Sequence, residues 1–256
     1  MSTEKAEALV LRVIEFSESS SVVTLYTREF GKIAGLAKGA RRPKGPFESA
    51  LDLLSRVRLV FLRKSSDALD LLTEAKLERR FRSHPSDLSY LYGAYYVAEL
   101  LNDLTHDGDP HPELFDLAIE TLEHLSGGDL PAGIVVLRFE LSALRMLGNL
   151  PSLRECAECG EVVATARRTA FGFGSGGVLC EKCRPGKKHV VSLSNEAVDL
   201  LETFADASEA WRSRAIDRRQ AGEMRGTVSR YVTYLLGRQP RMHEYLGVPD
   251  VQPSAK

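Results

Sequence analysis

The stretch CAECGEVVATARRTAFGFGSGGVLCEKC, residues 156–183, decides how the second half of the chain folds. It begins and ends with a Cys-x-x-Cys pair, and it holds all 4 cysteines of the 256-residue chain. Two such pairs about twenty residues apart match the ligand spacing of a four-thiolate zinc ribbon, in which two tight turns present sulfurs to one tetrahedral cation. We therefore expect one structural Zn²⁺ per chain, held by Cys156, Cys159, Cys180 and Cys183.

Two disulfides or four unrelated thiols are the alternatives for these cysteines. The N-terminal residues include acids and no long apolar core, so the sequence shows no signal peptide. No stretch approaches the roughly 18 uninterrupted apolar residues of a membrane span. We therefore expect a cytoplasmic, nucleoid-associated protein without membrane contact, and a reducing compartment favours metal binding over disulfides. Because four thiolates fill the coordination sphere, the zinc should be structural and not catalytic.

Charge is distributed unevenly along the chain, although the net charge is only −1. Residues 1–80 have a net charge of +4 and residues 81–155 a net charge of −8. The cysteine module, residues 156–189, has +3, and residues 190–256 are neutral. A basic first part followed by an acidic one indicates a polyanionic partner for one part of the protein only.

The first 80 residues have the pattern of short strands. Apolar and β-branched runs are bounded by polar or glycine-containing segments, at 8–14, 21–27, 32–37, 56–61 and 68–73, with a turn expected at 65–67. Five strands at this spacing favour a small barrel. An oligonucleotide-binding (OB) fold is the first candidate, and an SH3-like barrel fits the strand count equally well.

From residue 85 onward the apolar spacing becomes helical. The expected helices span about 86–104 (capped by Ser86 or Asp87), 112–127, 131–147, 194 onward and 222–237. The predicted fold class is therefore α+β and multidomain. Its predicted parts are an OB-fold barrel at 1–80, an α-helical bundle domain at 81–152 and 190–247, an inserted four-cysteine zinc ribbon at 153–189, and a flexible tail at 248–256.

The sequence contains no recognisable catalytic motif. It has no Walker loop, no Gly-x-Gly-x-x-Gly after a strand and no Gly-x-Ser-x-Gly. The 6 histidines are scattered along the chain. A zinc hydrolase needs an open coordination position, which a four-thiolate site lacks. We therefore expect a protein that is not an enzyme.

A loop rich in glycine, proline and basic residues follows the third predicted strand. Several cations along one surface are what phosphate neutralisation requires. The alternative is an ordinary charged loop that keeps a sheet edge soluble. Phe47, beside this loop, is the candidate for base stacking, whereas Phe61 alternates with core positions. The candidate DNA-binding residues are Lys32, Lys38, Arg41, Arg42, Lys44, Arg56 and Arg58.

Two separate parts of the chain resemble one known family. The pattern P-x-L-x-x-C-x-x-C-G at 151–160, followed by F-x-F at 171–173 and G-G-x-x-C-x-x-C at 176–183, resembles the zinc module of the bacterial RecO recombination-mediator family. The run LVLRVIEFSESSSVVTLYTREFGKIAGLAKGARR, residues 9–42, resembles the start of that family, including its Gly-Ala-Arg signature at 39–41. The resemblance covers nearly the whole chain in order.

The resemblance implies an OB-fold barrel, a helical domain and a structural zinc site. It also implies binding of single- and double-stranded DNA, annealing of complementary strands, and work with RecR to load RecA onto strands coated by single-stranded-DNA-binding protein. The family docks the acidic tail of that protein on its helical domain, where Arg138 and Arg145 lie two turns apart on one predicted helix face. The alternative for these two arginines is a structural role, in which their aliphatic stems pack on the helical bundle and their charged ends stay in solvent. For the whole chain, the alternative is a zinc-ribbon adaptor whose barrel binds an acidic protein.

Overall fold

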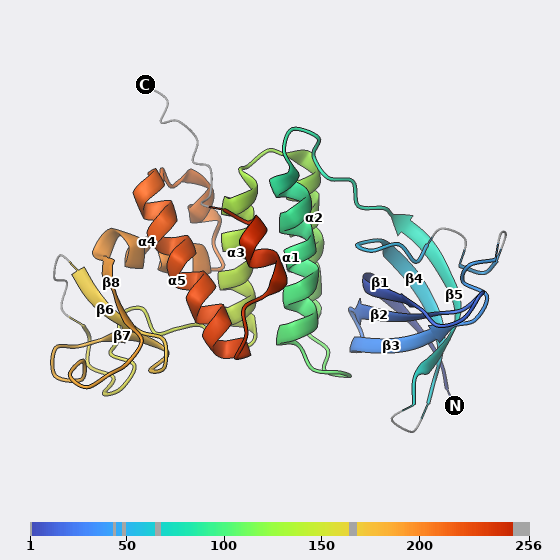
Figure 1. Ribbon diagram of the computed structural model, residues 1–256, viewed down its shortest axis with the longest axis horizontal. Coiled ribbons are helices and arrows are strands. Elements are labelled where there is room, and N and C mark those ends of the chain that lie inside the picture. The colour runs from blue at the N-terminus through green and yellow to red at the C-terminus, as the bar shows by residue number, and fades with distance from the viewer. Residues whose placement is uncertain (1, 43–44, 48–49, 65–67, 164–167, 248–256) are drawn as a thin grey trace. The chain divides into compact units, whose positions relative to one another are not determined.

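The structure is a computed structural model that describes residues 2–42, 45–47, 50–64, 68–163 and 168–247. The predicted turn at 65–67 and the predicted tail at 248–256 lie outside these residues. The chain forms two compact units, residues 1–127 and residues 128–256. Figure 1 shows the strands of the first unit in blue to cyan. Over the described ranges, every helix is too short or too polar to cross a bilayer.

Five strands of the first unit close into a barrel, in the order β1-β2-β3-β5-β4. The pairs are antiparallel except for β3 with β5. The five predicted strands are confirmed, but β1 and β5 run further than the apolar pattern indicates, because their polar ends also pair with β4. The strands are β1 (Ser2–Glu15), β2 (Ser21–Thr27), β3 (Gly31–Ala37), β4 (Arg56–Arg63) and β5 (Asp70–Arg79).

Buried and half-buried residues alternate along most of β2 and β3, because successive side chains of a strand point to the inside and the outside of the barrel in turn. Val23, Leu25 and Ile33 belong to the buried core, whereas Val22 and Leu36 are only half-buried on the exterior. The interior is therefore filled by side chains, and part of the exterior of β2 and β3 stays accessible to solvent.

A β-bulge changes the direction of the side chains along β1. Ala8 and Val10 point into the core, and strict alternation would send Arg12 inward as well. The pairing register shifts between Val10 and Arg12, so that Ile14 lies opposite Val22. Since residues paired across strands point to the same face, Arg12 and Ile14 lie on the exterior.

Two helices belong to the first unit, α1 (Leu88–Leu104) and α2 (Pro112–Gly127). Asp87 caps α1 by accepting a hydrogen bond from the Ser89 N–H at 3.0 Å, as the sequence predicts. α2 covers the barrel exterior at Tyr26, whose ring centroid is 6.4 Å from that of Phe115. The first compact unit therefore contains α1 and α2 together with the barrel.

The start of β3 packs closely against the loop between α1 and α2. Gly31 has a φ of +67°, and a Cβ at this position would lie 2.1 Å from the carbonyl oxygen of Asp109. The Gly108 N–H donates to the carbonyl oxygen of Lys32 at 2.9 Å. Only glycine combines the left-handed backbone with so close an approach.

The second unit consists of helices and a small antiparallel sheet with β6 in the middle. The sheet lies between α3 and α4 along the chain, where the ribbon was predicted. α5 begins before the predicted residue 222, because Asp217 and Gln220 form a capping box that apolar spacing does not reveal. The elements are α3 (Ala132–Met146), β6 (Arg168–Gly172), β7 (Gly177–Leu179), β8 (Val190–Ser194), α4 (Asn195–Ala205), the 3₁₀ helix η1 (Glu209–Ser213), α5 (Arg218–Leu236) and the 3₁₀ helix η2 (Arg241–Tyr245).

A buried ion pair joins α3 to α5. Arg225 Nη2 donates to Glu140 Oε1, and the two side chains are 7% and 0% exposed. Arg225 Nε also donates to Ser229 Oγ at 3.0 Å. Because both charges are removed from water, each depends on the other for its stabilisation.

We predict that Gly31→Ala destabilises the protein more than Gly108→Ala. Both positions have positive φ, so each substitution should cost about 1–2 kcal/mol of backbone strain. A methyl group at Gly31 also collides with backbone, whereas at Gly108 the nearest atom is 3.8 Å away. Chemical unfolding followed by circular dichroism measures the difference, and equal effects would show that the contact with Asp109 is dispensable.

We predict that Glu140→Ala destabilises the second unit by about 3–5 kcal/mol, because it leaves the Arg225 charge buried without its carboxylate. Replacing both residues, Glu140→Leu with Arg225→Met, should recover most of this loss. The one tryptophan of the chain, Trp211, lies in the second unit, so its fluorescence reports the unfolding of that unit. Arg154→Ala is the control, since the Arg154–Glu202 pair is solvent-exposed on the arginine side.

Candidate metal centre and nucleic-acid interface

The four cysteines lie in two tight turns of the second unit. In the first turn, the Gly160 N–H donates to the Cys156 carbonyl oxygen at 2.8 Å, and Gly160 has a φ of +73°. In the second, which follows β7, the Cys183 N–H donates to the Cys180 carbonyl oxygen at 3.2 Å. Each Cys-x-x-Cys spacing therefore closes one turn with both thiols on the same side.

The sulfur geometry fits a metal ion. All four Sγ atoms lie within 4.8 Å of one another, and Cys159 Sγ is 3.8 Å from Cys180 Sγ. Zinc–sulfur bonds of about 2.3 Å at tetrahedral angles place sulfurs about 3.8 Å apart. A disulfide requires about 2.05 Å, and all four cysteines are free thiols. The cluster can thus hold a metal such as zinc, and the geometry does not support the disulfide alternative.

The thiols differ in how readily they ionise. Burial acts to raise the pKa of Cys156, but hydrogen bonds from the backbone of Cys180, Cys159 and Glu158 together lower this pKa to about 6. Hydrogen bonds with the Cys180 and Cys159 side chains raise the pKa of Cys183 to about 12. Four adjacent thiolates repel one another, so full ionisation requires a cation, and metal binding should release protons.

The loop after β3 presents its cations to solvent and is fixed to the β1–β2 hairpin. The Arg41 N–H donates to the Ser19 carbonyl oxygen at 3.2 Å, and Arg41 Nη1 donates to Glu15 Oε2 at 2.8 Å. The side chains of this pair are 45% and 73% exposed, so water competes with it and a phosphate can replace the carboxylate. The exposed cations of the loop are Lys38, Arg41 and Arg42, while the predicted Lys44 lies outside the described residues.

Lys32 is not part of this exposed group. Its Nζ donates to the carbonyl oxygens of Asn102 at 2.7 Å and Thr105 at 2.8 Å, and it lies 3.4 Å from an Asp107 carboxylate oxygen. The side chain is 14% exposed. The ammonium stabilises the carbonyl end of α1, where a cation is favoured. We therefore assign Lys32 a structural role in place of the predicted DNA contact.

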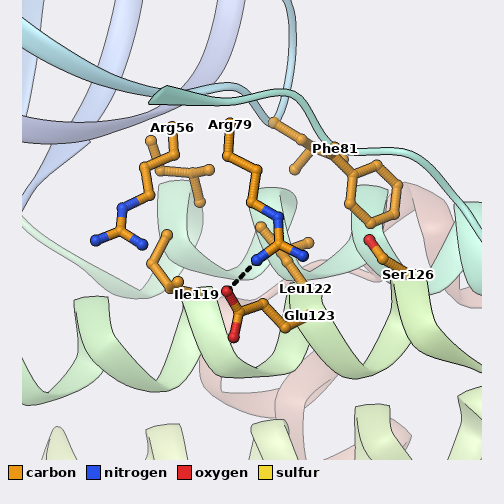
Figure 2. A pocket seen from close by; sticks show the side chains of 9 residues that line it. Arg56, Arg79, Phe81, Ile119, Leu122, Glu123 and Ser126 are labelled. Atoms are coloured by element: carbon orange, nitrogen blue, oxygen red, sulfur yellow. Dashed lines mark hydrogen bonds and ion pairs between the residues drawn. The ribbon is translucent and has the colours of Figure 1, made fainter. Parts of the chain in front are cut away.

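Arg56 and Arg58 share one face of β4, as their alternate spacing predicts, but they lie among acids. Arg56 pairs with Glu7 and Glu78, and Arg58 also pairs with Glu78. Figure 2 shows Arg56 on the wall of a pocket between the barrel and α2, where Arg79 bridges to Glu123. Arg56 and Arg58 therefore lie on β4, between β1 and β5 in the barrel, and are separate from the cations of the loop after β3.

The aromatic residues of the barrel are arranged differently from the sequence-based prediction. Phe47 is 2% exposed in the core, so the predicted base stacking by Phe47 is wrong. Phe61 is buried in the same core, as predicted. Phe16, which the sequence analysis did not single out, is 66% exposed. The signal that could have revealed it is its place in the otherwise polar run 15–20.

The two arginines proposed for a protein contact have different surroundings. Arg138 Nη1 donates to the carbonyl oxygen of Phe204 at 2.6 Å and to that of Asp206, and its guanidinium lies 5.7 Å from the Trp211 ring centroid. Arg138 therefore holds the end of α4, which agrees with the structural alternative. Arg145 is exposed on α3 and lines an open pocket with apolar residues of the segment that follows.

The chain is similar throughout its length to proteins of known family. Residues 1–81 match the family described as recombination protein O, N terminal, and residues 85–244 match recombination protein O, C terminal. The boundary between the two falls where the sequence changes from strands to helices.

Curated relatives cover most of the chain. A protein named DNA repair protein RecO from Rhodopirellula baltica is 39% identical over 95% of this chain and 98% of its own length. A protein of the same name from Anaeromyxobacter dehalogenans is 33% identical over 96% of both chains, and one from Exiguobacterium sibiricum is 35% identical over 79% of both. The resemblance noted in the sequence is therefore confirmed, and the chain belongs to the RecO family of DNA repair proteins.

Proposed function

We propose that this chain is a non-enzymatic DNA-binding protein that acts as a recombination mediator in DNA repair. The order β1-β2-β3-β5-β4 in a closed five-stranded sheet supports an OB-fold. OB-folds bind oligonucleotides on the face of strands 2 and 3 and on the adjacent loops. In this barrel the matching face is the partly accessible exterior of β2 and β3.

The observation that carries the proposal is the attachment of the exposed basic loop to the β1–β2 hairpin, through Arg41. This attachment holds Lys38, Arg41 and Arg42 at one end of the barrel. Annealing two strands requires cations that screen phosphate repulsion and leave the base edges free to pair. Three exposed cations on one attached loop meet this requirement for single- and double-stranded DNA.

Membership of the RecO family supports the finer parts of the proposal. These are annealing of complementary strands, work with RecR in the cytoplasm, and loading of RecA onto DNA coated by single-stranded-DNA-binding protein. For the acidic tail of that protein, Arg145 remains a candidate contact, whereas Arg138 is engaged inside the second unit. The same pocket is lined by a second cation, Arg154, which pairs with Glu202. Glu155 and Asp206 also line it, and their charges oppose an acidic ligand there.

For the cysteine cluster we propose one Zn²⁺ per chain, bound by Cys156, Cys159, Cys180 and Cys183. Four soft thiolates at tetrahedral spacing suit zinc. The metal would supply no reaction chemistry, because thiolates occupy every position. Its role would be to join the two turns into one ribbon.

We predict that Arg41→Glu with Arg42→Glu weakens binding to single-stranded DNA at least about tenfold at low salt. Loss of two phosphate contacts should also reduce the slope of log affinity against log salt by about 1.4. Fluorescence anisotropy of a labelled oligonucleotide across a salt series measures both quantities. Thermal unfolding should change little, because the Arg41–Glu15 pair is solvent-exposed and the backbone bond from Arg41 to Ser19 does not depend on the side chain.

The matched control is Arg218→Glu with Arg219→Glu, which makes the same charge change on exposed residues at the start of α5. It should bind DNA like the wild type. An equal loss in both variants would indicate a general charge effect and not a site on the loop. Absence of salt-sensitive DNA binding in the wild type would favour the adaptor alternative, in which the barrel binds an acidic protein.

We predict that Cys156→Ser abolishes zinc retention and lowers the melting temperature of the second unit, because three thiolates cannot complete the tetrahedron. DNA binding through the barrel should be partly retained. Elemental analysis of the purified protein measures the metal, and chelation of the wild type should reproduce the loss of stability. A variant that keeps one zinc per chain at full stability would contradict the four-ligand assignment.

A further inference from the structure

The tip of the β1–β2 hairpin presents an aromatic side chain to solvent. Phe16 is 66% exposed and Ile14, two residues before it, is 43% exposed. The Phe16 N–H donates to the Ser20 carbonyl oxygen at 2.9 Å, so the backbone at Phe16 is held by the turn. A single exposed apolar residue needs no explanation, but two on one face of a strand begin a patch.

The strand register extends this patch across the barrel exterior. Ile14 lies opposite Val22, Val22 opposite Leu36, and Leu36 beside Leu71. Paired residues point to the same face, so the four side chains form one apolar row, in which the last three are half-buried. Phe16 follows the end of β1, and its N–H bond to Ser20 continues the β1–β2 pairing one position past Glu15 and Ser21. From this continuation we infer that Phe16 shares the face of Ile14, two residues before it.

Cations border this apolar row. Arg12 lies on the same exterior face of β1, two residues before Ile14. At the hairpin end, Arg41 is bound to Glu15 and to the backbone of Ser19, both within three residues of Phe16. An apolar surface with an exposed aromatic ring and a cationic border is complementary to an unpaired nucleic acid strand, whose bases stack and whose phosphates are anionic.

We propose that Phe16 is the base-stacking residue of this barrel and that it makes unpaired strands bind more tightly than duplex, with the row Ile14, Val22, Leu36 and Leu71 as the supporting surface. The inference rests on the proposed function and deepens it. In a duplex the bases stack on each other and offer only phosphates to this surface, so Phe16 gains nothing from paired DNA. The arginines contribute to both forms.

The β-bulge is the second structural reason to place the contact here. Without the shift between Val10 and Arg12, the residues Arg12, Ile14 and Phe16 would share the inward direction of Val10. The bulge turns Arg12 and Ile14 outward, and Phe16 follows them where the β1–β2 pairing continues. Bulges redirect side chains next to functional sites. An exposed phenylalanine contributes little to folding, so its place on the exterior is better explained by a ligand than by stability.

The test compares Phe16→Ala with the wild type on three labelled probes of equal length, roughly 16 nucleotides. These are a thymidine single strand, the matching duplex, and a strand with the same phosphates and abasic sugars. Phe16→Ala should weaken binding to the thymidine strand at least about fivefold, as expected for loss of one stacked base. Binding to the duplex and to the abasic strand should change less than about twofold, and the salt slope should be unchanged.

Two further variants keep the result interpretable. Phe16→Trp should restore binding to the thymidine strand, because indole also stacks. Leu88→Ala, which removes an apolar side chain that is 60% exposed at the start of α1, should leave all three affinities unchanged.

An equal loss on all three probes, or no loss on the thymidine strand, overturns the stacking assignment. If the wild type binds the probes with salt sensitivity and only the Phe16 effect is missing, this inference fails and the proposed function stands. If the wild type binds none of them, both fail.

Discussion

The pairing of β1 along both of its edges is the constraint on which the first unit depends. β1 pairs with β4 from Ser2 to Leu9 and with β2 from Ala8 to Glu15, with an overlap at Ala8 and Leu9. This overlap closes the sheet, and closure gives every strand an inside and an outside. Closure therefore decides which side chains form the core, which exterior side chains such as Tyr26 are covered by α2, and which exterior residues of β2 and β3 stay accessible.

The cations of the first unit differ in function because they differ in their neighbours. Lys32 is used to stabilise the end of α1, and Arg56 is held by Glu7 and Glu78. The backbone bond from Arg41 to Ser19 fixes the loop, while the exposed ion pair with Glu15 is weak and leaves the guanidinium available to another anion. A polyanion gains most from cations that are exposed and fixed in place, so the loop after β3 is better suited to phosphates than β4.

In the second unit, two different kinds of contact hold together segments that are distant in the sequence. The ribbon has a small sheet and two turns, and four sulfurs converge on one point between them. The helices are joined by apolar packing and by the buried pair of Glu140 and Arg225. Four thiols that can hold one metal ion suit a module too small for a large core, whereas the helices can bury enough apolar surface.

The sequence by itself determined the five barrel strands, the five α-helices and the cysteine cluster, because these depend on local spacing; it did not reveal the short strands β6 to β8 or the 3₁₀ helices η1 and η2. The Cys-x-x-Cys pairs close single turns, and the strand and helix periods need only neighbouring residues, apart from the polar ends of β1, β5 and α5. Only the tertiary structure decided which way individual side chains point and which groups they bond to. The bulge after Val10 reversed the direction of Arg12 and Ile14, Phe47 lies in the core, and Lys32 and Arg138 donate to carbonyl groups of distant segments. Such outcomes depend on contacts between residues far apart in the chain, which no local pattern records.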